Sequence, residues 1–246
     1  MIFFAKKKIK NKYLFILCPP FSGSTLLTEI IATLKNVSPN NEYGTREGQT
    51  LPSVRKIMFD HEDRWNPNLF YDWKFIKKEW LKHWDTSKTI LLEKSPPNII
   101  RSFKIQKVFK PAYFICMVRN PYARCERNKR MGGDLIEAAK SMVMQLKYQK
   151  NNIEKLDRVL FFTYEKLTEN PKKVKTEMIK FIPELEDINI DLISSAHNFL
   201  NKKMKIRNLN YEKIKKLNRE DLEKLNSIFK KENEILSYFG YDVIDY

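Results

Sequence analysis

Cysteine is scarce in this 246-residue sequence, and it has no long apolar segment. Its three cysteines, Cys18, Cys116 and Cys125, show no metal-binding spacing, and an odd number cannot form a complete disulfide framework. Two of them lie in or beside strand-like apolar runs, so we interpret them as buried thiols in a reducing compartment. No apolar run approaches the roughly 20 residues of a membrane-spanning helix. The sequence therefore does not indicate a disulfide-rich, metal-stabilised or transmembrane protein.

Acidic residues are also fewer than basic residues in this sequence. The chain has 46 Lys and Arg residues against 30 Asp and Glu residues, a formal net charge of +16. Such a field attracts anions, which include nucleotides, sulfated or phosphorylated substrates, nucleic acids and acidic membranes. A basic protein that binds nucleic acid or a membrane surface is one hypothesis. No helix-turn-helix, zinc or RNP-type signature supports specific nucleic-acid binding, however.

Strand-like and helix-like segments alternate along most of the chain. Continuous apolar runs, typical of strands buried on both faces, occupy residues 13–18, 89–92, 112–118 and 159–162. Amphipathic patterns typical of helices occupy residues 24–34, 72–84, 97–108, 134–156 and 172–182, and another helix is expected to begin at Pro121. This alternation predicts right-handed βαβ units in a three-layer α/β fold with a central parallel sheet.

Beyond residue 183 the pattern is wholly helical. Two amphipathic segments, 190–200 and 220–238, are joined by a basic stretch. The chain length suits one α/β domain with a helical appendage. We therefore interpret residues 1–246 as a single domain, with a nucleotide-binding core over 1–182 and a helical C-terminal region over 183–246.

The loop after the first apolar run is the strongest local signal. The run ends at two prolines, and one glycine and three hydroxyl side chains then precede an amphipathic helix: Ser22, Gly23, Ser24 and Thr25. A helix N-terminus offers unpaired N–H groups and the positive end of the helix dipole, which suits phosphate or sulfate. The loop is not a Walker A motif, because it has one glycine and no lysine. An ordinary kinase or ATPase is therefore disfavoured.

Four segments in order resemble the motifs of sulfotransferases. The loop, continued by Leu26 and Leu27, resembles the 5′-phosphosulfate loop, [KR]-[ST]-G-[ST]-[ST]-x-[LW]. Residues 93–96 (EKSP) resemble the E-K-[TS]-P element, residues 118–121 (VRNP) the 3′-phosphate element, and residues 164–171 the Y-E-x-L-x-x-x-P element. The resemblance spans roughly residues 13 to 182. Four ordered matches are far more specific than any one of them.

The resemblance implies a P-loop-like fold and transfer of a sulfuryl group from 3′-phosphoadenosine 5′-phosphosulfate (PAPS) to a hydroxyl or amine, without a metal. Ser24, Thr25 and Lys94 would hold the phosphosulfate, and Arg119 the 3′-phosphate. Tyr164 would lie near the adenine or the 3′-phosphate. The full set of expected donor-binding residues is Phe21, Ser22, Gly23, Ser24, Thr25, Leu26, Lys94, Arg119, Arg127, Tyr164, Lys205 and Arg207, the last two from the basic C-terminal stretch.

Two positions depart from the family pattern. Phe21 stands where the family has Lys or Arg, and an aromatic side chain cannot neutralise charge on the bridging oxygen as sulfate leaves. Either Lys94 substitutes for that cation, or the protein binds the nucleotide without transferring sulfate. Arg127 stands where the family usually has a serine, and a helical spacing of eight residues returns it to the face of Arg119.

The catalytic base and the acceptor are the most open assignments. Counted without gaps from the loop, Glu42 falls where tyrosylprotein sulfotransferases carry their base; Glu47, His61, Glu62 and Glu93 are rivals. A carbohydrate, a protein tyrosine, a lipid or a small metabolite all fit as acceptor. Golgi sulfotransferases carry a membrane anchor. Since this sequence has no apolar run of that length, we expect a cytoplasmic enzyme.

Overall fold

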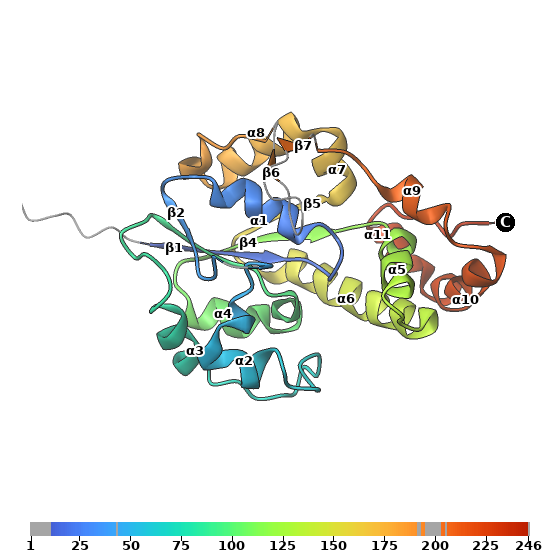
Figure 1. The fold of residues 1–246 in the computed structure, drawn as a ribbon, viewed down its shortest axis with the longest axis horizontal. Helices are drawn as coiled ribbons and strands as arrows, with labels where there is room; N and C mark the ends of the chain where they lie inside the picture. Colours follow the sequence, from blue (N-terminus) through green and yellow to red (C-terminus); the bar gives the residue numbers. More distant parts are fainter. Residues whose placement is uncertain (1–10, 43, 191–192, 195–202, 205, 246) are drawn as a thin grey trace, which may run out of the picture.

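The core of the protein is a five-stranded parallel sheet with strand order β2-β3-β1-β4-β5. The computed structural model describes residues 11–42, 44–190, 193–194, 203–204 and 206–245 (Figure 1). The strands are β1 (Lys12–Leu17), β2 (Val37–Pro39), β3 (Ile90–Glu93), β4 (Ala112–Val118) and β5 (Val159–Thr163). The four predicted strands and their parallel pairing are confirmed. The sequence pattern missed β2, because three residues ending in a proline carry almost no strand signal.

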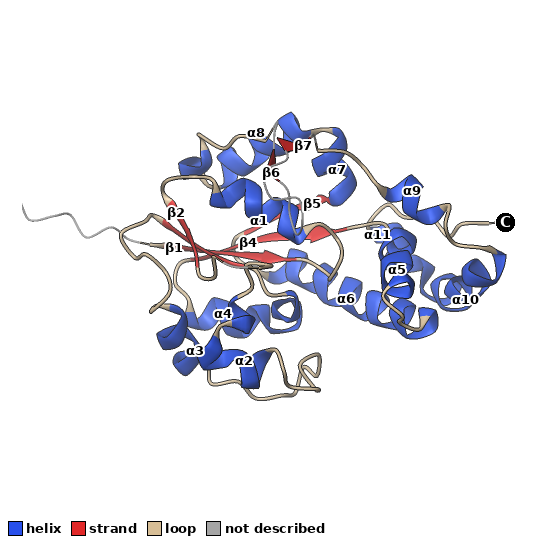
Figure 2. Cartoon of the chain, viewed as in Figure 1, coloured by secondary structure: helices blue, strands red, loops and turns tan. Residues whose placement is uncertain are grey.

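Helices cover both faces of this sheet, as Figures 1 and 2 show. Alternate residues of β1 point into two separate apolar clusters, as the two-residue period of a strand requires. One face is covered by α1 (Ser24–Ala32), α7 (Tyr164–Glu169) and α8 (Pro171–Phe181). The other is covered by α2 (Pro52–Met58), α3 (Trp73–Trp80), η2 (Pro96–Arg101), α4 (Ser102–Val108) and part of α6 (Leu135–Lys155). The three-layer α/β prediction is confirmed.

An aromatic cluster fixes α3 beneath β1. The rings of Tyr13, Trp80, Trp84 and Phe109 lie 5.2–6.2 Å apart, mostly edge to face. The indole N–H of the fully buried Trp80 donates to the carbonyl of Gly48, 3.2 Å away. Gly48 begins the short helix η1 (Gly48–Thr50). The core therefore anchors a loop that reaches the edge of the sheet.

The C-terminal helices pack against α5 (Pro121–Arg130) and α6 and form a third apolar cluster. They are α9 (Asn210–Ile214), α10 (Arg219–Phe229), η4 (Lys230–Glu232) and α11 (Asn233–Tyr238). Tyr122 of α5 is central to the contact. Its ring lies 5.0 Å from that of Phe229, and its hydroxyl donates to Asn226 and accepts from the backbone N–H of Ile244.

The prediction of a helix over 190–200 is wrong in the part of that segment that the structure describes. Ile193–Ser194 forms strand β6, which pairs antiparallel with β7 (Lys203–Met204). Short apolar segments fit a helix and a strand about equally well, and here the backbone partner decides. Residues 191–192, 195–202 and 205 lie outside the described residues. The predicted helix over 220–238 is broken by η4.

Truncation of Phe229 tests whether the C-terminal helices and the α/β core form one cooperative unit. Phe229 is fully buried, so F229A should cost about 3 to 5 kcal/mol. We expect a single thermal transition whose midpoint falls by several degrees. F70A is the matched control, because Phe70 is 84% exposed, and its midpoint should stay within one degree or so. Two separate transitions, with only one sensitive to F229A, would contradict the single-domain assignment.

Candidate functional site

The loops that follow the strands meet at one edge of the sheet. In a parallel sheet all carboxyl ends point the same way, and ligands bind in the crevice outside them. Here the loop after β1, residues 94–96 after β3, Arg119 after β4 and Tyr164 after β5 all reach this edge. Segments that lie up to 140 residues apart in sequence are thus brought together by strand order.

The loop after β1 forms a tight cradle at the start of α1. Gly23 caps the helix with φ of +96°, and a Cβ built on it would lie 2.7 Å from the Tyr164 ring, so only glycine fits. The side-chain oxygen of Ser22 is buried and has no hydrogen-bond partner among the residues that the structure describes. Buried hydroxyls are normally hydrogen-bonded, so this orphaned group indicates a ligand position. Ser24 is buried, and Thr25 and Leu26 are half-buried in the first turn.

Phe21 takes part in the site through its backbone. It adopts φ of +65°, an uncommon value for a bulky residue, and 42% of its side chain is exposed. Its carbonyl accepts a hydrogen bond from Arg119 Nη1 at 3.3 Å. The Arg127 guanidinium lies 5.7 Å from the centre of its ring, within cation–π range. The loop and both predicted phosphate-binding arginines therefore meet around Phe21.

Arg119 is buried and held on three sides. Its guanidinium lies 4.0 Å from the centre of the Tyr164 ring, and Nε donates to Asn210 Oδ1 at 2.7 Å. Nη2 is buried without a protein partner. Burial lowers the pKa of Arg119, but an arginine remains charged at physiological pH. A fixed cation with one free N–H₂ group, close to the Ser22 cradle, suits an anionic ligand.

Glu165 joins the motifs after β4 and β5 to the C-terminal region. Its carboxylate accepts from the backbone N–H of Asn120 and from the Tyr241 hydroxyl, both at 2.9 Å, and from the Asn210 amide. Asn210 in turn binds Arg119. Asn210 could not be predicted from the sequence, because an isolated asparagine in a basic stretch matches no motif.

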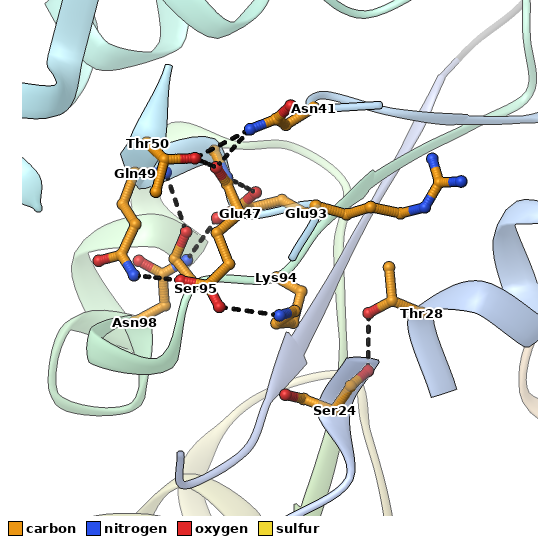
Figure 3. Close-up of polar contacts among 12 residues, drawn as sticks. Ser24, Thr28, Asn41, Glu47, Gln49, Thr50, Glu93, Lys94, Ser95 and Asn98 are labelled. Carbon is orange, nitrogen blue, oxygen red and sulfur yellow. Dashed lines mark hydrogen bonds and ion pairs between the residues drawn. The ribbon is translucent and has the colours of Figure 1, made fainter. Parts of the chain in front are cut away.

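The motif after β3 binds the segment 47–49 residue by residue (Figure 3). Lys94 Nζ lies 2.9 Å from Glu47 Oε1, Glu93 Oε2 accepts from the Gly48 N–H at 3.0 Å, and Ser95 Oγ accepts from the Gln49 N–H at 3.1 Å. Figure 3 also shows Lys94 between Glu47 and Ser24 of α1.

The Cys18 thiol, at the end of β1, lies within electrostatic reach of both Lys94 and Arg119. Burial raises the pKa of Cys18, while the charges of Lys94 and Arg119 and contacts from Ser24 act against that rise. Both cations thus lie near the end of β1. All three cysteines are free and buried, as predicted.

The remaining predicted residues lie further out. Glu42 is exposed and lines an open pocket of about 650 Å³, together with Asn40, Thr50, Arg55 and His83. Arg207 is exposed and paired with Glu212, while its carbonyl accepts from the Tyr164 hydroxyl at 3.2 Å. Lys205 lies outside the described residues.

Among the described residues, no group of three or more His, Cys, Asp or Glu side chains could hold a metal ion.

These observations define a P-loop-like α/β protein with a loop at the carboxyl edge of its sheet whose geometry suits an anion. The model of the sulfotransferase family matches residues 14–186, and the chain belongs to that family. It is therefore a transferase, and its family implies a small-molecule sulfonate donor and an acceptor. A search of curated proteins found no match. None of the described helices is long and apolar enough to cross a membrane.

Several solved structures share this fold. The sulfotransferase domain from the curacin biosynthetic pathway is 17% identical with a TM-score of 0.55, and the match covers 96% of this chain and 99% of that one. The sulfotransferase domain of the Synechococcus PCC 7002 olefin synthase is 19% identical, with a TM-score of 0.54 and 97% and 98% covered. A sulfotransferase from Mycobacterium avium is 14% identical, with a TM-score of 0.56 and 95% and 78% covered.

The buried Glu93 predicts an unusual pH dependence of stability. Burial raises its pKa to about 7, so between pH 4.5 and 7 the folded protein holds a proton that the unfolded chain releases. Stability should therefore fall as pH rises through this window, by about 3 kcal/mol from this group. In E93Q the new amide can donate to Asn98 Oδ1 once the Asn98 amide, which now donates to Glu93 Oε1, turns over.

Urea unfolding at pH 5 and pH 8 measures this effect. We expect the wild type to lose about 3 kcal/mol more than E93Q between the two pH values. E137Q, a surface change on α6, should follow the wild type. Equal pH slopes for wild type and E93Q would contradict a buried carboxyl with a raised pKa.

Proposed function

We propose that this protein transfers a sulfuryl group from PAPS to an acceptor hydroxyl or amine. The observation that carries the proposal is the pair of orphaned buried groups, Ser22 Oγ and Arg119 Nη2, at the N-terminus of α1. Both can donate hydrogen bonds, and each would gain a partner from an anion. Family membership supplies the reaction class, and these groups supply the reason to place a phosphorylated donor here.

The proposed donor-binding residues fit a nucleotide that carries a 5′-phosphosulfate and a 3′-phosphate. The N–H groups and hydroxyls of Ser22, Ser24 and Thr25 would hold the 5′-phosphosulfate at the helix N-terminus. Arg119, with Arg127 at the rim, would hold the 3′-phosphate. When bound, PAPS supplies the activated sulfuryl group. The protein orients the donor and stabilises the developing charge by fixed dipoles and cations, which is usually the largest catalytic term.

The acceptor would enter through the open pocket beside Glu42. This pocket offers amide, hydroxyl, guanidinium and imidazole groups, which suit a polar acceptor. A carbohydrate, a protein tyrosine, a lipid head group or a small metabolite fits that description. We also propose a single-domain, cytoplasmic enzyme without specific nucleic-acid binding, and the three free buried thiols support the reducing compartment.

A second candidate is a nucleotide-binding protein that has lost the transfer reaction. Phe21 removes the cation that the family pattern carries at this position, and Lys94 is neutralised by Glu47. Tight binding of the product nucleotide together with no sulfated product from any acceptor would favour this alternative.

Thermal melts with 3′-phosphoadenosine 5′-phosphate (PAP) test the donor site directly. At 100 times its dissociation constant, PAP should stabilise the protein by roughly 2.7 kcal/mol, while 5′-AMP, ADP and ATP with Mg²⁺ should give much smaller shifts. R119Q should lose most of the PAP shift, because it removes the charge that faces the 3′-phosphate. R130Q is the matched control, since Arg130 lies on the same α5 helix as Arg127 but pairs with Glu126 at the surface. A shift with ATP alone, or none, would overturn the proposal.

A further inference from the structure

The carboxylate of Glu47 is held in a fixed position at the edge of the sheet. Its backbone carbonyl accepts from Asn41 Nδ2 at 3.0 Å and from Thr50 Oγ1 at 2.7 Å. Its Oε2 accepts from the Gln49 side-chain amide, and its Oε1 from Lys94. The backbone and Oε2 are thus held independently of Lys94, so Oε1 can change its partner while the carboxylate stays at this edge, in position to accept a proton.

The neighbours of Glu47 are fixed as well. Gly48 is held at its N–H by Glu93 and at its carbonyl by Trp80, and the Gln49 N–H is held by Ser95. A Cβ on Gly48 would lie 2.2 Å from Asn40 and 2.6 Å from Glu93, so the segment is closely packed around that glycine. The core and the motif after β3 thus converge on one short segment, and its one acidic side chain is Glu47.

Glu47 and Lys94 differ in accessibility. The Lys94 side chain is 2% exposed, whereas that of Glu47 is 13% exposed. The ammonium is therefore the more shielded of the two groups, and a carboxylate oxygen takes the position beside it. A sulfuryl oxygen carries the same kind of charge and could take that position. In the protein as it stands, Glu47 and an incoming sulfuryl group compete for one cation.

From this arrangement we propose that Glu47 is the catalytic base of the transfer and that binding of the donor releases it for this role by replacing it on Lys94. The inference rests on the proposed function. It also accounts for Phe21: the cation missing from the loop is supplied by Lys94, but only after the carboxylate has been displaced.

The chemical step balances without any further reactant. The acceptor oxygen forms a bond to sulfur on the side opposite the leaving oxygen. The bond from sulfur to the bridging oxygen breaks, and its electron pair goes to the 5′-phosphate. The acceptor O–H proton passes to the Glu47 carboxylate, and Lys94 stabilises a sulfuryl oxygen.

The other carboxylates at this edge are less suited to the role. Glu93 is fully buried behind the segment, and its two oxygens are occupied by Gly48 and Asn98. Glu42 is exposed and lines the outer pocket, where it can contact the acceptor. In the part of the chain that the structure describes, Glu47 is the one of these three carboxylates that forms an ion pair, so donor binding has no comparable ion pair to replace at the other two.

The test combines donor binding with turnover for E47Q, E47D, E42Q and the control E184Q. Glu184 also pairs with a lysine, Lys12, but at the opposite end of β1. Binding of PAPS and of PAP is measured by calorimetry without acceptor. Turnover is followed as PAP release from PAPS with a phenol, a sugar and an amine as acceptor probes, and with water alone. Melting temperatures report folding.

We expect E47Q to lower kcat by about 10² to 10⁴-fold, the usual contribution of a general base. It should also tighten PAPS binding several-fold relative to PAP, because the competitor for Lys94 is gone. A purely structural residue would not show this opposite pair of effects. E47D keeps the charge but withdraws it by one methylene, and it should lose at least tenfold in kcat even if E47Q folds poorly. E42Q should act mainly on the acceptor KM, and E184Q should match the wild type.

Two results would overturn the inference. One is a large loss of kcat in E42Q with near-normal kcat in E47Q and E47D, which would make Glu42 the base. The other is an E47Q protein whose PAPS and PAP affinities change equally, which would remove the exchange on Lys94. A wild type that neither binds PAP nor releases it from PAPS would overturn the proposed function itself, and this outcome is distinct because it appears before any substitution is made.

Discussion

Parallel pairing of β1 with β3 on one side and β4 on the other is the constraint on which the site depends. The two contacts place the loop after β1 between residues 93–95 and Arg119, at the end of the sheet where all strands terminate. Pairing of β4 with β5 then adds Tyr164 and Glu165. No local interaction within any one of these segments could assemble the site. The sheet does so because its hydrogen-bond register fixes where each strand ends.

The site has two halves that are held in different ways. On one side, Glu165, Asn210 and Tyr241 tie the arginine that would face the 3′-phosphate to the C-terminal region. On the other, the motif after β3 holds the segment 47–49 through three successive contacts. The half proposed to bind the donor therefore depends on long-range docking of the C-terminal helices, and the half proposed to bind the acceptor depends on the aromatic cluster beneath β1. A substitution in either packing region would therefore alter the position of side chains at the edge of the sheet.

The buried polar groups of this edge carry an energetic cost. Ser22 Oγ, Arg119 Nη2 and the side-chain amide of Asn40 are buried without protein partners. Each such group costs free energy of order 1–3 kcal/mol unless a ligand or a water satisfies it. Folded proteins keep such groups chiefly where function requires them, and two of them, Ser22 Oγ and Arg119 Nη2, lie together at the loop after β1.

Continuous apolar runs and ordered motifs are local patterns. Four of the five strands, their parallel arrangement, the loop before α1 and the family could therefore be predicted from the sequence. It could not find β2 or the β6–β7 pair, since such short strands are specified by their partners. It also could not choose among Glu42, Glu47 and Glu93, because exposure, burial and an ion pair with Lys94 arise only when β3 and the 47–49 segment meet. The contact of Arg119 with the Phe21 carbonyl and the ion pair of Lys94 with Glu47 became visible only in the tertiary structure, because each joins segments far apart in the sequence.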